Sequence, residues 1–160
     1  MKREIKKYLF FSASALLLLS ILVLNACKDK PEGPSEEEVQ LQKLSKVWNL
    51  ASVSLDGADP GVDYANFRLT LSGTVGAANF TYSTQGRPIR SPWPGNGTWR
   101  FGAVVASQII RDAGTNDELP LSYSISQDGN SLEITFNFSG EGYTAGRLDN
   151  VSGNWRFTFN

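Results

Sequence analysis

The chain has 160 residues, of which 41% are hydrophobic, and its 15 basic and 16 acidic side chains give a formal net charge of −1. It has no histidine and one cysteine, which excludes Ser-His-Asp and Cys-His mechanisms, histidine zinc sites and any disulfide within the chain. Its length suits one domain once a targeting segment is set aside.

The first 26 residues have the three parts of a secretory signal peptide. Basic residues dominate Met1–Lys7, an apolar run covers Tyr8–Leu24, and small residues follow. The motif Leu24-Asn25-Ala26-Cys27 resembles the lipobox of bacterial lipoprotein precursors, which implies cleavage before Cys27 and lipid on its sulfur. Several acyl chains, at about 0.8 kcal/mol per buried methylene, would then anchor the protein. An uncleaved transmembrane anchor is the alternative, because the apolar run is nearly long enough to span a bilayer.

Residues 27–38 are predicted to be a flexible tether, because prolines, a glycine and many charges cannot bury a core. Loss of residues 1–26 removes four basic residues and one acidic residue, so the net charge becomes about −4, which argues against nucleic acid as a partner. Lys28 stands where the inner-membrane retention signal of enteric lipoproteins has aspartate. The lipoprotein resemblance therefore implies anchoring in the outer membrane.

A short helix is expected at the start of the folded domain, which we place at residues 39–160. Ser35 and Glu38 have the spacing of a capping box. Apolar residues then recur among polar ones as far as Leu44, which predicts a helix from about Glu36 to Leu44.

From Lys46 onward, apolar and polar residues alternate, so each segment has one buried and one exposed face as a β-strand. Imperfect alternation in the first and fifth segments allows a β-bulge in either. Asp128-Gly129 predicts a tight hairpin that uses positive φ angles. The predicted strands lie within Val47–Leu55, Phe67–Ser72, Asn79–Ser83, Gly97–Gly102, Val104–Arg111, Leu121–Ser126, Ser131–Phe138 and Trp155–Asn160.

No helical stretch of crossover length separates these segments, which excludes a parallel sheet. About eight antiparallel strands in succession form either a closed up-and-down barrel or a two-sheet sandwich. We favour the all-β barrel, because the final strand needs a partner edge that the first strand can supply. A porin-type barrel is disfavoured, because its strands run about 9 to 11 residues and most apolar runs here are shorter.

Three segments, Leu44–Trp48, Gly97–Phe101 and Ser152–Phe159, resemble those of lipocalin-like lipoproteins of Gram-negative bacteria. The resemblance covers roughly residues 41–160. The resemblance implies a lipocalin-like barrel. Because the residues also exclude most enzyme classes, we expect a monomeric protein without enzymatic activity or cofactor that binds a small apolar or amphipathic ligand or a partner protein.

The loop Arg87–Asn96 contains Trp93 between two prolines, which stiffen it and remove backbone donors. With Arg87 and Arg90 nearby, an exposed Trp93 would stack on a sugar or hold an anion, as in an accessory glycan-binding surface module. We favour the other interpretation, in which Trp93 plugs one end of the barrel, because a large exposed apolar ring is unusual without a partner. A structural envelope protein with a filled core is a third hypothesis. The candidate ligand-binding residues are Trp93, Arg87, Arg90, Trp99, Tyr82 and Tyr123.

The acidic side chains suggest two kinds of carboxylate chemistry, a catalytic acid pair and a calcium site. The candidate acids lie almost entirely in predicted turns, where carboxylates usually hydrogen-bond to nearby backbone. The run from Asp112 to Glu118 lacks the spacing of an EF-hand. We therefore expect no catalytic residue and no metal site. The acids are Asp56, Asp59, Asp63, Asp112, Asp117, Glu118, Glu133 and Glu141.

Overall fold

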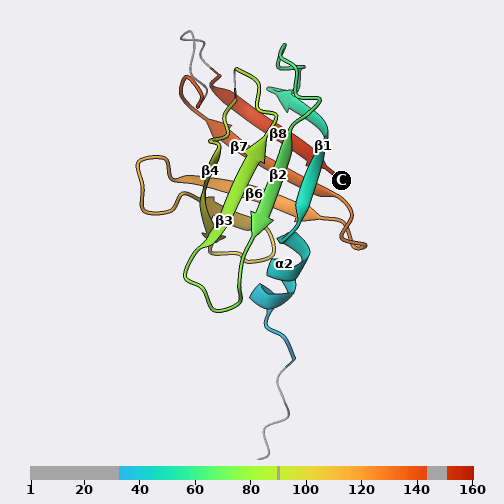
Figure 1. The fold of residues 1–160 in the computed structure, drawn as a ribbon, viewed down its shortest axis with the longest axis vertical. Coiled ribbons are helices and arrows are strands. Elements are labelled where there is room, and N and C mark those ends of the chain that lie inside the picture. Colours follow the sequence, from blue (N-terminus) through green and yellow to red (C-terminus); the bar gives the residue numbers. More distant parts are fainter. Residues whose placement is uncertain (1–32, 90, 144–150) are drawn as a thin grey trace, which may run out of the picture. The chain divides into compact units, whose positions relative to one another are not determined.

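A computed structural model describes residues 33–89, 91–143 and 151–160. Cys27 and the proposed signal peptide and lipobox lie outside these ranges. Within them, one helix is followed by eight strands, in the order and almost at the positions that the alternation predicts (Figure 1). The elements are α2 (Glu36–Leu44), β1 (Val47–Leu55), β2 (Arg68–Ser72), β3 (Phe80–Gln85), β4 (Asn96–Phe101), β5 (Gln108–Arg111), β6 (Leu119–Ile125), β7 (Leu132–Phe138) and β8 (Gly153–Phe159).

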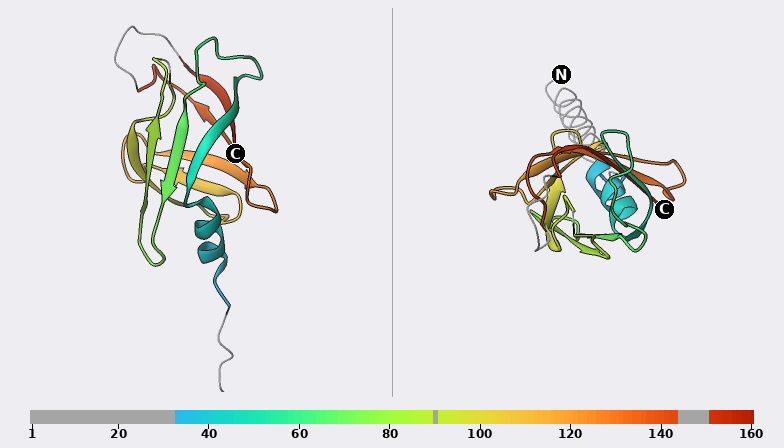
Figure 2. Two further views of the ribbon diagram at one scale, coloured as in Figure 1. Left: turned by 45° about the vertical axis from the view of Figure 1, so that its right-hand side comes forward. Right: turned by 90° about the horizontal axis from the view of Figure 1, so that it is seen from above.

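The strands form a closed antiparallel barrel in which each strand pairs with the next (Figure 2). The ring closes where β1 pairs with β8, from Leu50 opposite Phe159 to Leu55 opposite Trp155. The predicted up-and-down barrel is thereby confirmed over the sandwich. The register shifts between Leu50 and Ser52, so the β-bulge allowed for the first strand is present. Such a bulge bends the strand and increases its twist, as a small barrel requires.

Two local predictions need correction. The fifth strand is shorter than expected, because the carbonyl of Val104 accepts hydrogen bonds from the backbone of Ser107 and Gln108 and forms a turn there. At Asp128-Gly129 only the glycine has a positive φ, 71°. The turn with two positive φ angles is at Asp56-Gly57, 51° and 80°, where Leu55 and Ala58 exchange both backbone hydrogen bonds, as in a two-residue type I′ turn.

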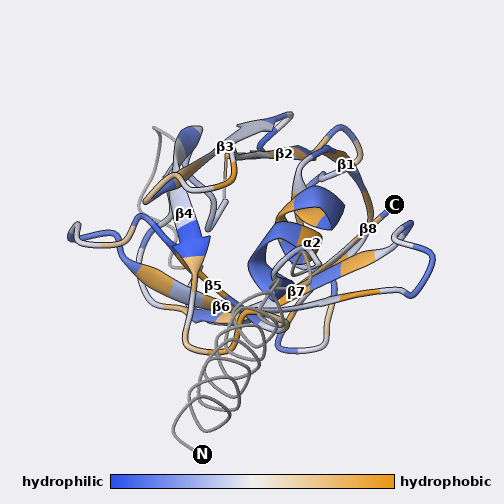
Figure 3. Ribbon diagram, turned by 90° about the horizontal axis from the view of Figure 1, so that it is seen from below, coloured by the Kyte–Doolittle hydropathy of each residue, from blue (hydrophilic) through white to orange (hydrophobic). Residues whose placement is uncertain are grey.

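Helix α2 closes the lower end of the barrel, at which β2, β4, β6 and β8 finish (Figure 3). The predicted capping box is present: the Ser35 hydroxyl accepts from the backbone of Glu38, whose carboxylate accepts from that of Ser35. The helix buries Leu41 and Leu44, and the indole of Trp48 donates to the Leu44 carbonyl at 2.9 Å. Within the described residues, no helix has the length and apolar character needed to cross a membrane.

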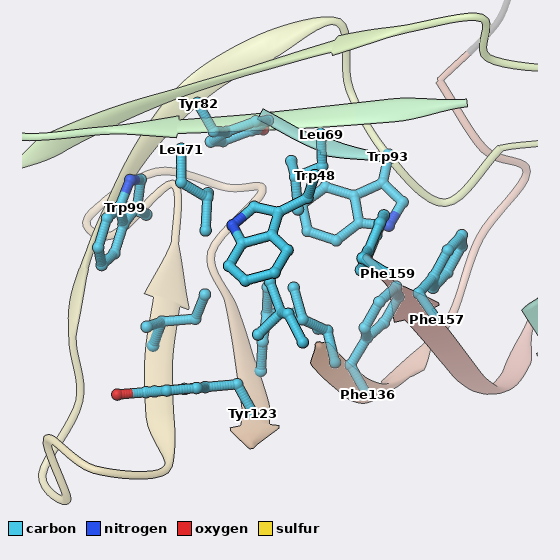
Figure 4. Packing of buried hydrophobic residues seen from close by; sticks show 14 of the residues in the cluster. Trp48, Leu69, Leu71, Tyr82, Trp93, Trp99, Tyr123, Phe136, Phe157 and Phe159 are labelled. Atoms are coloured by element: carbon cyan, nitrogen blue, oxygen red, sulfur yellow. The ribbon is translucent and has the colours of Figure 1, made fainter. Parts of the chain in front are cut away.

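The interior of the barrel is filled by side chains, many of them aromatic (Figure 4). The inward faces that alternation predicts are buried, except that Ile125 is half-buried against the core. Rings from neighbouring strands are in contact, such as Phe136 and Phe157, stacked with centroids 5.9 Å apart. The buried inward-facing residues include Phe67, Leu69, Leu71, Phe80, Tyr82, Trp99, Phe101, Tyr123, Phe136, Phe138, Trp155 and Phe157, together with Trp48, Ile134 and Phe159.

Candidate functional site

The upper rim of the barrel is formed by the loops that follow β1, β3, β5 and β7, at the end opposite α2 (Figure 1). Trp93, in the loop after β3, is only 1% exposed. Its ring makes edge-to-face contacts with the rings of Tyr82, Phe136 and Phe157, with centroids 5.7–6.1 Å apart. Trp93 therefore plugs the rim, and the alternative of an exposed stacking platform is wrong, because other rings enclose the indole.

The remaining candidate residues do not form one site. Arg87 donates to the Trp93 carbonyl at 3.1 Å and so braces the plug, whereas Arg90 lies outside the described residues. Trp99 donates through its indole to the Thr81 carbonyl at 3.0 Å. The Tyr123 hydroxyl donates to the carbonyl of Val105, in the loop between β4 and β5 at the lower end. Among the candidates that the structure describes, Tyr82 is the one whose ring packs against the ring of Trp93.

Arg111, which the sequence analysis did not single out, is the charged centre of the rim. It ends β5 and is 1% exposed. Its guanidinium carbon lies 5.4 Å from the ring centroids of both Trp93 and Tyr143. Nη1 donates to the Pro92 carbonyl at 2.8 Å, and Nη2 donates to the Tyr143 hydroxyl at 3.3 Å. Arg111 therefore ties the plug to the barrel wall. Its position two residues after Ile109, on the inward face, was the available signal.

Asp112 balances the charge of Arg111 and is itself fully engaged. Its Oδ2 lies 3.5 Å from the Arg111 Nε and accepts from the Tyr82 hydroxyl at 2.7 Å, while Oδ1 accepts from the Thr98 backbone. A methyl group on Gly97 would lie 2.1 Å from Oδ1, so only glycine lets the carboxylate approach β4 this closely. Burial, and then the bond to Asp112, raise the pKa of the Tyr82 hydroxyl.

Within the described residues, the buried indole N–H of Trp93 lacks a hydrogen-bond partner, whereas the Arg111 Nε faces the Asp112 carboxylate at 3.5 Å. The other three tryptophans each donate to a backbone carbonyl at 2.9–3.0 Å. An unpaired buried donor is costly. Among the described residues, the plug therefore keeps one unsatisfied buried donor, the Trp93 indole.

A cleft of about 390 Å³ opens beside Arg111, between the loop after β5 and the end of β7. The Tyr143 hydroxyl donates to Asp117 at 3.1 Å and links its two sides. Burial raises the pKa of Tyr143, so the hydroxyl stays protonated and able to donate. We call this space the rim cleft. Its polar lining includes Arg111, Asn116, Asp117, Asn137, Glu141 and Tyr143.

A second cleft, of about 550 Å³, lies on the outer face of β6, β7, β8 and β1. A cross-strand row of outward side chains, from Ser122 through Thr135 and Arg156 to Ser54, lines it. Arg156 is exposed and pairs with Glu133 at 3.1 Å. Because this groove holds no buried charge, the rim cleft is the stronger candidate.

The turn carboxylates mostly bond to nearby backbone. Asp59 accepts from Gly61, Asp63 from Ala65 and Glu118 from Gly114, at 2.6–2.7 Å. Within the part of the chain that the structure describes, no three acidic or cysteine side chains lie close enough to hold a metal ion together. The turns thus have the hydrogen bonds typical of Asx motifs.

Fold and rim together define a closed eight-stranded antiparallel β-barrel with a filled interior and a buried arginine at one end. Comparisons with protein-family models, with curated proteins and with solved structures find no match for this chain.

Proposed function

We propose that this protein is a lipid-anchored outer-membrane binding protein of the lipocalin-like type, without enzymatic activity, whose ligand binds in the rim cleft. The rim cleft beside the buried Arg111 is the observation that carries this proposal, because the packed interior leaves the rim as the place for a ligand. Aromatic side chains occupy the lumen, α2 covers the lower end, and Trp93 covers the upper end. A ligand cavity of the usual 300 Å³ or more is instead found at the rim, beside Arg111.

A structural envelope protein is the second candidate, and the same packed core favours it. Native mass spectrometry of the mature protein, purified in detergent from its own host, distinguishes the two. We expect a bound small molecule that is lost from an Asp117→Asn variant and kept by a Glu133→Gln control, whose side chain lies on the outer face of β7. A ligand-free protein from every growth condition would favour the structural candidate.

The lipid anchor has its own test. We expect the wild-type protein to incorporate radioactive palmitate and to fractionate with the outer membrane. A Cys27→Ser variant should incorporate no label, because the thioether cannot form. Label retained by this variant would contradict the proposed anchor.

A further inference from the structure

We infer that the rim cleft binds a neutral sugar unit, an inference that rests on the proposed function and names its ligand class. Charge gives the first argument. Asp117, Glu118 and Glu141 line the cleft with carboxylates, whereas Arg111, the one cation among the described lining residues, is already paired with Asp112. An anionic ligand would therefore meet a surplus of negative charge.

Hydrogen bonding gives the second argument. Arg111 has five N–H donors: one on Nη1 bonds to Pro92, one on Nη2 bonds to Tyr143, and Nε faces the Asp112 carboxylate at 3.5 Å. The second N–H of each Nη has no hydrogen bond to a described residue. The side chain is 1% exposed and lines the cleft. Remaining guanidinium donors in a buried position favour a ligand that brings acceptor oxygens. A simple organic cation brings none.

The lining also presents hydrogen-bond acceptors, which favour a ligand that carries donors. The carboxylates of Asp117 and Glu141 accept only, and the amide of Asn116 both donates and accepts, while that of Asn137 already donates to Asn154. Each hydroxyl of a sugar is a donor and an acceptor in one group, so a polyhydroxylated ring satisfies both sides of the cleft. An acyl chain would leave these groups unpaired, which opposes a lipid in this place.

The test titrates the mature protein in detergent with neutral, uronic-acid and amino-sugar oligosaccharides, with spermidine and inorganic phosphate as charged probes. We expect saturable calorimetric binding of at least one neutral oligosaccharide. Asp117→Asn and Glu141→Gln should each weaken it about 10-fold or more, since each replaces a charged acceptor. Glu133→Gln, on the outer face, should leave the affinity unchanged. Thermal melting confirms that each variant is folded.

Several outcomes would overturn the inference. Binding of only charged probes, or binding of neutral sugars with equal affinity by Asp117→Asn, would show that the cleft does not recognise sugar hydroxyls. A non-sugar molecule found by native mass spectrometry, with no neutral oligosaccharide bound, would refute the sugar but keep the proposed binding function. Absence of any ligand by both methods would overturn both.

Discussion

Trp93 illustrates how one side chain joins a loop to the core. Replacement by alanine removes a large ring that is 1% exposed and contacts three other rings. We expect Trp93→Ala to lower the free energy of unfolding by about 3–5 kcal/mol, as is typical of buried aromatic deletions. Urea denaturation, followed by circular dichroism, measures the change.

Ile89→Ala is the matched control from the same loop, because Ile89 is 67% exposed. Its effect should stay within about 0.5 kcal/mol. Equal denaturation midpoints for Trp93→Ala and the wild type would contradict the plug and would return Trp93 to the list of ligand-binding residues.

Arg111 shows where residue-level prediction from the sequence stops. A charged residue in an alternating pattern is ordinarily assigned to the exposed face, yet Arg111 shares the inward face with Ile109. What makes burial tolerable is the combined pairing with Asp112, Pro92 and Tyr143. Pro92 and Tyr143 come from segments far from Arg111 in the sequence. No spacing within the sequence reveals that the fold brings Tyr143 to Arg111.

Among the elements, the strands could be predicted almost completely, because one buried face per strand imposes a period of two. The start of the fifth strand could not. Its apolar residues Val104 and Val105 belong to the predicted segment in spite of the imperfect alternation there, but backbone bonds to Val104 turn the chain before β5 begins. At this position a hydrogen-bonded turn is more stable than a longer strand. The sequence alone does not show which of the two is favoured.

Helix α2 makes a prediction at the scale of the element. Leu44 is fully buried, and its carbonyl accepts from the Trp48 indole. We expect Leu44→Ala to destabilise the domain by about 2–5 kcal/mol and to change the tryptophan fluorescence of the folded protein. Lys43→Ala, at an exposed position, is the control. A Leu44→Ala variant as stable as this control would show that the helix does not seal the barrel.

For the whole molecule, buried phenols predict sensitivity to alkali. Burial raises the pKa of Tyr64, Tyr82, Tyr123 and Tyr143 in the folded state, whereas the unfolded value is about 10. The unfolded chain therefore loses protons first as the pH rises. Stability should hold below about pH 10 and fall above it, by about 1.4 kcal/mol per pH unit for each phenol kept protonated.

Urea midpoints between pH 8 and pH 11.5, with tyrosinate absorbance recorded in parallel, check this expectation. Tyrosinate from these phenols should appear together with unfolding, and Tyr82→Phe should reduce the slope. Full tyrosinate absorbance near pH 10 in a protein that is still folded would contradict the burial of these hydroxyls.

The pairing of β1 with β8 has a consequence for how the protein is made. Its sealing contacts join Leu50 to Phe159, at the two ends of the domain. The chain leaves a ribosome or a translocation channel with its amino end first. The barrel therefore cannot close until β8, its last strand, has emerged. Until then β1 and β7 are open edges, available to neighbouring chains. Newly synthesised copies are thus most prone to aggregate just before completion, when a chaperone would protect them most.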